Sequence, residues 1–123
     1  MLDTSVAIAL RDGDASVIRQ LRAAASPACF SVVTLVELEA GLFGRDADLR
    51  RERLATLLET IPVIEFTEAE AVAYGRILTD TGFSRRKVLD RMIAAQAIVA
   101  GATLATLNPV DFRDIPGLSL LEW

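Results

Sequence analysis

The stretch KVLDRMIAAQAIVAG, residues 87–101, combines helical spacing with an ionisable group on its apolar side. At 3.6 residues per turn, Asp90 shares a face with Ile93, Ala94 and Ala97, which are core residues by type. Burying a carboxylate without a partner has a cost on the order of several kcal/mol. Asp90 therefore needs a partner, which is either a neighbouring basic side chain or a bound cation.

Three further carboxylates stand in apolar or strand-end surroundings. Asp3 follows the apolar start of the chain, Glu37 lies within LVELEAG, and Asp111 lies within NPVDF. Each acid also has an ordinary structural interpretation. Asp3 can be a helix N-cap, Glu37 a helix-edge side chain that reaches solvent, and Asp111 a turn former. Asp90 can interact with the helix dipole or pair with a nearby Arg or Lys.

A single explanation covers all four acids, because carboxylates that converge on one divalent cation no longer repel each other. Oxygen ligands and the absence of histidine favour Mg²⁺ or Mn²⁺. Such a cluster suits phosphodiester hydrolysis, since the metal lowers the pKa of the attacking water and neutralises developing negative charge. We therefore expect a cation to be the partner of Asp90.

The composition excludes several other chemistries. With one cysteine and no histidine, the chain has no internal disulfide, no Cys/His zinc site, and no Ser-His-Asp or Cys-His nucleophile. The net charge of −4 gives no general basic field, so a polyanion would bind through local basic groups or metal ions. A single unpaired cysteine suits a reducing compartment, and we expect a cytoplasmic protein.

The length and the polar breaks point to one domain outside the membrane. A chain of 123 residues is expected to form a single domain over residues 1–123. Charged residues interrupt the N-terminus, so no signal peptide is expected. The uncharged run 92–110 is broken by Gly101 and Pro109, which favours a helix, a glycine cap and a buried strand over a membrane span.

The elements that must position these acids alternate between strands and helices. Strands are predicted at 1–3, in the run ACFSVV after Pro27, and at 62–66, 102–107 and 118–123. Helices are predicted at 5–10, 15–25, 34–43, 46–60, from a Thr67–Glu70 capping box to 81, and at 88–100, with a basic loop at 84–87. This alternation predicts an α/β domain whose mostly parallel central sheet is flanked by helices, with ligands beyond the carboxyl ends of the strands.

Four stretches resemble a known family in the family's own order. LDTSV at 2–6, VELEAG at 36–41, LDRMIAAQAIVAGATLATLNPVDF at 89–112 and IPGLSLLEW at 115–123 are similar to a PIN-domain ribonuclease, specifically a VapC-type toxin of a bacterial type II toxin–antitoxin system. The resemblance implies a PIN-like fold and metal-dependent endoribonuclease activity on RNA phosphodiester bonds. It also implies a cognate antitoxin that blocks the site, and commonly a toxin homodimer.

Carried over by position, the resemblance implies that Asp3, Glu37 and Asp90 bind Mg²⁺ or Mn²⁺ and act in catalysis. Some family members have an acid where this chain has Asn108, and others have one just before the phenylalanine, which is Asp111 here. We take Asp111 as the fourth acid and Asn108 as a polar neighbour.

Small polar and basic side chains complete the expected site. The small polar ones match positions that can orient carboxylates or metal-bound waters, and they are Thr4, Ser5 and Thr106. Arg85, Arg86 and Lys87 directly precede the helix that carries Asp90, and these side chains could hold RNA phosphates. A solvated basic loop is the alternative. Apolar grooves along the helices between 34 and 60 are the expected docking surface for an antitoxin.

Two other functions remain open. A phosphatase-like, Mg²⁺-dependent phosphoryl-transfer enzyme would need a nucleophilic aspartate beside its metal ligands. The usual second aspartate two residues after Asp3 is absent, because Thr4 and Ser5 follow it. A non-catalytic interaction module would bind no metal and would tolerate the substitution Asp90→Asn.

Overall fold

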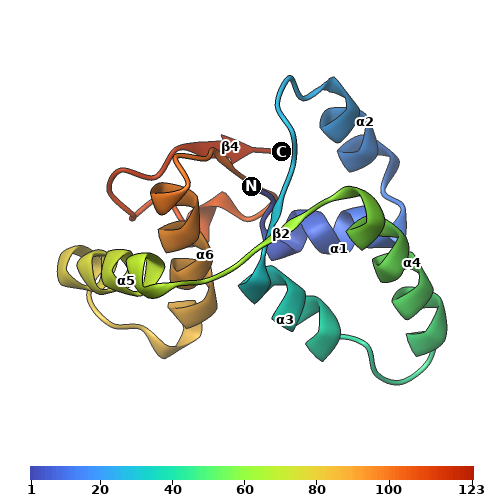
Figure 1. The fold of residues 1–123 in the computed structure, drawn as a ribbon, viewed down its shortest axis with the longest axis horizontal. Coiled ribbons are helices and arrows are strands. Elements are labelled where there is room, and N and C mark those ends of the chain that lie inside the picture. The colour runs from blue at the N-terminus through green and yellow to red at the C-terminus, as the bar shows by residue number, and fades with distance from the viewer.

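The computed structural model describes residues 1–123 and places short strands between two groups of helices (Figure 1). In Figure 1, α1 to α4 lie on one side of the molecule, and α5 and α6 lie on the other. In chain order the elements are α1 (Thr4–Asp12), α2 (Ala15–Ala23), β1 (Phe30–Ser31), α3 (Val32–Ala40), α4 (Ala47–Thr60), β2 (Val63–Ile64), α5 (Glu68–Thr81), the 3-10 turn η1 (Arg85–Lys87), α6 (Val88–Val99), β3 (Leu104–Thr106), the 3-10 turn η2 (Pro109–Asp111) and β4 (Leu120–Glu122).

The strands form one parallel arrangement with the N-terminal segment at its centre. β1 pairs with β2, and β3 pairs with β4, both in parallel. Leu2 joins the two pairs through parallel bridges to Phe30 and Ala105. The backbone bonds Leu2 N to Cys29 O and Asp3 N to Ala105 O, each 2.9 Å long, complete this centre. The predicted α/β fold with parallel strands and flanking helices is confirmed, and Asp3 lies at the carboxyl end of the central segment.

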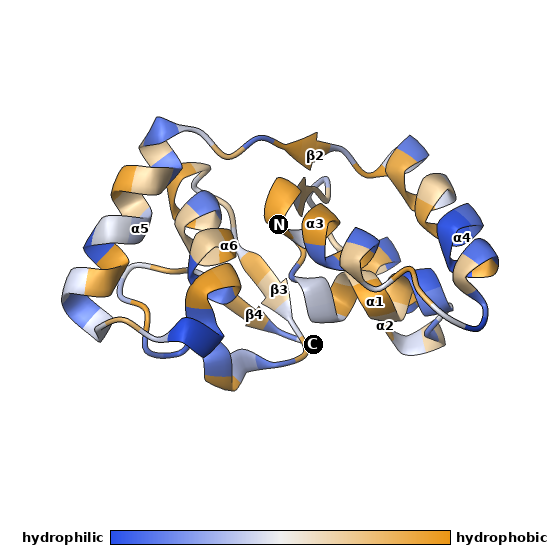
Figure 2. Ribbon diagram, turned by 90° about the horizontal axis from the view of Figure 1, so that it is seen from below, coloured by the Kyte–Doolittle hydropathy of each residue, from blue (hydrophilic) through white to orange (hydrophobic).

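Two apolar clusters fill the space on either side of this arrangement. One packs α1 to α4 together and includes Val6, Leu38 and Leu54. The other packs α5 and α6 against β3 and includes Ile93 and Phe112. Figure 2 shows apolar residues concentrated on α1 and β2, while α4 carries hydrophilic residues along much of its length. The site residues at the strand ends are thus held between two packed bodies of helices.

The uncharged run 92–110 folds as predicted. It forms most of α6, a turn at Gly101 with φ of 59°, and the buried strand β3. Ile93, Ala94 and Ala97 are fully buried, so the face that carries Asp90 does point into the protein. No helix in the structure combines the length and apolar character that crossing a bilayer requires. The predicted Thr67–Glu70 capping box at the start of α5 is also confirmed.

Two local predictions were wrong. The run 28–33 is not a full strand, because β1 ends at Ser31, whose hydroxyl accepts a hydrogen bond from Val33 N (2.9 Å) and caps α3. Val32 and Val33 enter the helix despite their β-branching, since burial of Val33 outweighs a small difference in propensity. The predicted basic loop 84–87 contains the turn η1, closed by Lys87 N donating to Ser84 O (3.1 Å).

Candidate active site

Asp3 is buried at the end of the central strand segment and caps the N-terminus of α1. Its Oδ2 accepts hydrogen bonds from Ser5 N (3.3 Å), Ser5 Oγ (2.6 Å) and Thr106 Oγ1 (2.9 Å). Oδ1 accepts none, and it is not sealed from solvent. The N-cap interpretation is therefore correct, but it uses only one oxygen and leaves the other free to bind a ligand.

The hydroxyls that hold Asp3 are themselves held by the backbone that follows β3. Leu107 N donates to Ser5 Oγ (3.1 Å), and Asn108 N donates to Thr106 Oγ1 (2.9 Å). Each hydroxyl thus has both a donor role and an acceptor role, which fixes its rotamer. The network joins the start of α1 to the carboxyl end of β3, and it orients the carboxylate of Asp3.

Glu37 faces the start of α1 from the neighbouring helix α3. Its Oε2 accepts a 2.6 Å hydrogen bond from Thr4 Oγ1, which also lies 3.5 Å from Thr34 Oγ1. Thr34 is fully buried and was not predicted as part of the site. Its signal in the sequence is its position three residues before Glu37, which places both side chains on one helical face.

Asp90 is half-buried in the first turn of α6 and has neither a hydrogen bond nor an ion pair. Its pKa is raised from 3.8 to about 6, first by burial and then by the negative charges of Asp111, Asp3 and Glu37, while Lys87 opposes the shift. These effects place Asp111, Asp3 and Glu37 within electrostatic reach of Asp90. Asp3, Glu37 and Asp111 are thus near enough to Asp90 to raise its pKa, and their joint binding of a cation stays a prediction.

The basic side chains near Asp90 do not neutralise it. Arg91 Nη2 lies 3.2 Å from Asp114 Oδ2, and Lys87 Nζ lies 3.5 Å from the same oxygen. This excludes the interpretation of Asp90 as an ion-pair partner. Arg85 and Arg86 are exposed and make no ion pair, so they remain available to a ligand, whereas Lys87 is already engaged.

Asp111 and Asn108 lie on the turn η2 just beyond β3. Asn108 Nδ2 donates a hydrogen bond to Asp111 Oδ2. Among the charges that raise the pKa of Asp90, that of Asp111 has the largest effect. The geometry thus agrees with Asp111 as an acid facing the cluster and Asn108 as the amide that orients it.

The donor types in this cluster fit a hard divalent cation. All four groups are carboxylates, hydroxyls hold Asp3 and Glu37, and none of the four acids forms an ion pair with Lys or Arg. The acids do not form a ready-made ligand set, because no three acidic, histidine or cysteine side chains stand in a metal-binding arrangement. The negative charges of Asp111, Asp3 and Glu37 repel that of Asp90 and raise its pKa. A bound cation would offset this repulsion.

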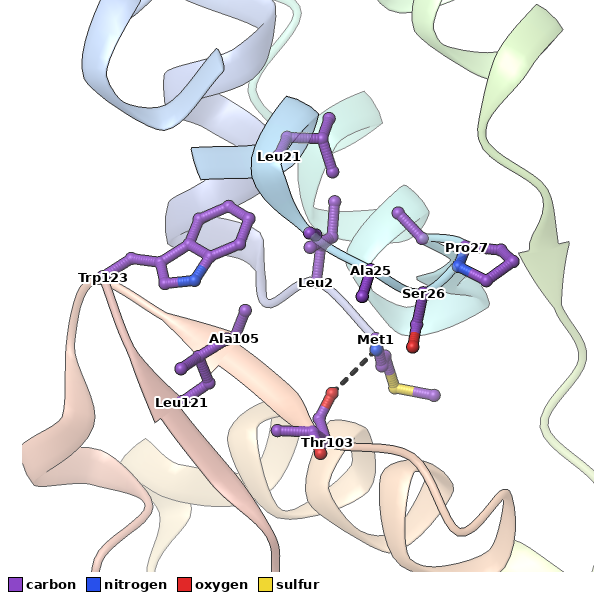
Figure 3. Close-up of a pocket in the computed structure, with 12 residues that line it drawn as sticks. Met1, Leu2, Leu21, Ala25, Ser26, Pro27, Thr103, Ala105, Leu121 and Trp123 are labelled. Carbon is purple, nitrogen blue, oxygen red and sulfur yellow. Dashed lines mark hydrogen bonds between the residues drawn. The ribbon is translucent and has the colours of Figure 1, made fainter. Parts of the chain in front are cut away.

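The cavities of the protein lie away from these acids. The better-enclosed one has a volume of about 250 Å³ and lies between α2, the segment 24–28 and the strands β3 and β4. Leu21, Leu121 and Trp123 line it, and the Met1 amine donates to Thr103 O at its edge (2.8 Å, Figure 3). A second, open hollow lies between α5 and α6. Neither cavity runs along the helices between residues 34 and 60. Neither therefore corresponds to the groove that was predicted to bind an antitoxin.

Comparison with known proteins places this geometry in a family. The PIN domain family matches residues 1–118. Ribonuclease VapC1 of Rickettsia felis is 31% identical over 128 residues, which cover 98% of this chain and 93% of that protein. The tRNA(fMet)-specific endonuclease VapC of Salmonella typhimurium is 27% identical, with coverage of 100% and 96%.

A solved structure agrees with the sequence relatives. The structure of VapBC2 from Rickettsia felis bound to a DNA fragment from their promoter contains a chain with a TM-score of 0.87 to this one. That match has 26% sequence identity and covers 100% of this chain and 97% of the other. The resemblance stated from the sequence is confirmed, and this chain belongs to the PIN-domain family as a VapC-type ribonuclease.

Proposed function

We propose that this protein is a Mg²⁺- or Mn²⁺-dependent endoribonuclease that acts as the toxin of a toxin–antitoxin pair. The proposal rests mainly on the surroundings of the Asp90 carboxylate. This half-buried carboxylate has no hydrogen bond and no ion pair, and three other carboxylates raise its pKa. A protein gains nothing in stability from such an arrangement, so it is best explained by a cation that the cluster holds during function.

In this proposal Asp3, Glu37, Asp90 and Asp111 hold the cation. A bound Mg²⁺ or Mn²⁺ would lower the pKa of an attacking water and neutralise charge that develops on the phosphate. Asp3 would contribute its free Oδ1, because Ser5 and Thr106 occupy Oδ2. The supporting hydroxyls keep the carboxylate oxygens from rotating away, which is the usual role of groups one contact removed from a metal ligand.

Thr4 and Asn108 are assigned the corresponding role for the other two acids. Thr4 holds one oxygen of Glu37, and Asn108 holds one oxygen of Asp111. In each case the second oxygen is left for the cation. The pattern is the same at Asp3, so three of the four acids have one oxygen fixed by the protein and only Asp90 has none.

Substrate phosphates must approach a cluster of like charge on a protein whose net charge is −4. We assign their attraction to the cation and to Arg85 and Arg86, which lie in η1 immediately before α6 and are exposed. Lys87 contributes less in this proposal, because it is already paired with Asp114. The bases of the RNA are not assigned to any side chain.

A cognate antitoxin is the proposed partner. The support comes from the structural relative solved as VapBC2 from Rickettsia felis and from the DNA-bound VapBC of Salmonella typhimurium, whose similar chain has a TM-score of 0.87 at 25% identity. We also propose a toxin homodimer, in line with the family resemblance. Co-expression with the product of an adjacent short gene should give a stable complex whose nuclease activity is suppressed.

The test of the proposed activity is cleavage of RNA by purified protein in Mn²⁺, in Mg²⁺ and in EDTA. We expect cleavage only with a metal ion, its loss in Asp3→Asn and Asp90→Asn, and its retention in Asp48→Asn. Asp48 is a matched control, because it is an exposed aspartate on α4 that pairs only with Arg51. Hydrolysis of a simple phosphomonoester without RNA cleavage would favour the phosphatase-like alternative. No product together with normal behaviour of Asp90→Asn would favour the interaction module.

A further inference from the structure

Asp114 contacts side chains from two other elements, η1 and α6. Its Oδ2 lies 3.2 Å from Arg91 Nη2 of α6 and 3.5 Å from Lys87 Nζ of η1. Arg91 also donates through Nη1 to Thr81 Oγ1 at the end of α5. The carboxylate therefore connects the segment that follows η2 with the end of α5 and the start of α6.

Arg91 is buried, so its guanidinium needs the contact with Asp114. Arg91 is only 2% exposed, and its Nε has no acceptor. A guanidinium taken out of water needs a counter-charge, and Asp114 is the one carboxylate that pairs with it. The pair is asymmetric, because the guanidinium of Arg91 is buried whereas the side chain of Asp114 is 44% exposed, so loss of Asp114 would leave a buried charge without its partner.

Each member of this ion pair lies close in the sequence to one of the acids. Arg91 directly follows Asp90 in the chain, and Asp114 comes three residues after Asp111. The ion pair therefore ties the backbone beside Asp90 to the backbone beside Asp111. A change in this contact is therefore expected to alter the separation of Asp90 and Asp111.

A second ion pair, exposed at the surface, joins the same segment to β4. Arg113 makes three hydrogen bonds to the carboxylate of Glu122 on β4, at 2.8 to 3.0 Å. Phe112 and Ile115, on either side of the two charged residues, are buried in the core. The segment 112–115 is thus fixed towards α6 by Asp114, towards β4 by Arg113, and inwards by two apolar side chains.

The contact with Lys87 extends the effect to the basic turn. Lys87 ends η1, whose other residues, Arg85 and Arg86, are exposed and unpaired. Asp114 therefore fixes the turn that carries the proposed phosphate-binding arginines as well as the segment that carries Asp111. One carboxylate sets the position of a basic group and of an acidic group relative to Asp90.

We propose that Asp114 is a positioning residue for the nuclease site: through Arg91 and Lys87 it sets the spacing of Asp111 and of the basic turn relative to Asp90. This inference rests on the proposed metal-dependent function. Asp114 itself touches neither the cation nor the RNA in this scheme. The competing interpretation is that the pair only stabilises the fold.

The test compares Asp114→Asn with the conservative Asp114→Glu and with the control Asp48→Asn. Mn²⁺ is titrated against the melting temperature of each protein, and KM and kcat for RNA cleavage are measured at saturating Mn²⁺. We expect Asp114→Asn to raise the Mn²⁺ concentration at half-saturation by about tenfold and to raise KM. Asp114→Glu should recover part of both effects, and Asp48→Asn should match the wild type.

A lower melting temperature of the metal-free Asp114→Asn protein, with wild-type Mn²⁺ half-saturation and KM, would overturn the inference, because a purely structural pair predicts that result. If Asp114→Asn does not fold, Asp114→Glu carries the test, since it keeps the charge and moves the carboxylate by one methylene. Its Mn²⁺ half-saturation should also rise, and an unchanged value would contradict the inference. A wild-type protein without any Mn²⁺ response would refute the proposed function as well, whereas a normal wild-type response with unaffected variants refutes the positioning role alone.

Discussion

Replacing Asp90 by asparagine should stabilise the metal-free protein at neutral pH. The pKa of Asp90 in the folded protein is raised from 3.8 to about 6, mainly by burial and by the charges of Asp111, Asp3 and Glu37. A raised pKa means that the folded state binds a proton more tightly than the unfolded state does. Stability therefore falls as pH rises from about 4 to about 6, and the ionised carboxylate opposes folding at every higher pH.

The magnitude follows from the size of this shift. One pKa unit corresponds to about 1.36 kcal/mol, so the full shift would amount to about 3 kcal/mol, and solvent screening at a half-exposed side chain reduces the expected effect to about 1–2 kcal/mol. Asparagine keeps the shape of the side chain and removes its charge. In EDTA at pH 7.5, Asp90→Asn should therefore unfold with a free energy about 1–2 kcal/mol above that of the wild type.

Urea unfolding in EDTA at pH 7.5 and at pH 4.5 measures the effect. The gain should be full at the higher pH and clearly smaller at the lower one, because pH 4.5 lies near the bottom of the range, about 4 to about 6, over which the penalty builds up. The control Asp48→Asn should show no gain at either pH, because Asp48 is exposed and outside the cluster. Equal gains at both pH values, or an Asp90→Asn protein that is less stable than the wild type at pH 7.5, would refute the reasoning.

Three further outcomes are expected from the same geometry. Single and double substitutions among Asp3, Glu37 and Asp90 should be non-additive in single-turnover cleavage, with the first removing most activity, because the acids serve one cation; additive losses would contradict a shared site. Arg86→Ala should weaken RNA binding and reduce the slope of log K against log salt by about one, with cleavage at saturating RNA nearly unchanged; a normal salt slope would exclude the phosphate contact. Thr4→Val should lower activity about tenfold through Glu37, whereas Thr4→Ser should retain most of it; equal losses in both would indicate a packing effect.

The positions of the acids were predictable because they follow from local rules. Parallel strands end at one edge of a sheet, so an acid after the first strand and a polar turn after β3 must meet there. The spacing within residues 87–101 places Asp90 on the inward face of its helix. Capping signals at Thr67 and Gly101 also depend only on neighbouring residues, and both were correct.

The features that escaped prediction depend on partners distant in the chain. Arg91 and Asp114 are separated by 23 positions, and nothing in their spacing indicates that they pair. Asp114 also accounts for a difference within the basic turn. Lys87 lies 3.5 Å from its carboxylate, whereas Arg85 and Arg86 form no ion pair. The residues Val32 and Val33 have strand-forming side chains, but the capping hydroxyl of Ser31 and burial against α6 place them in a helix. Tertiary contacts of this kind outweigh local preference.

Anomalous scattering from crystals soaked in Mn²⁺ would test the central claim most directly. The account predicts one or more manganese peaks among the carboxylates of Asp3, Glu37, Asp90 and Asp111, with Asp3 contributing Oδ1, and no peak at this place in crystals of Asp90→Asn. A peak elsewhere on the protein, or none at this cluster in a crystal whose protein cleaves RNA in Mn²⁺ solution, would contradict it.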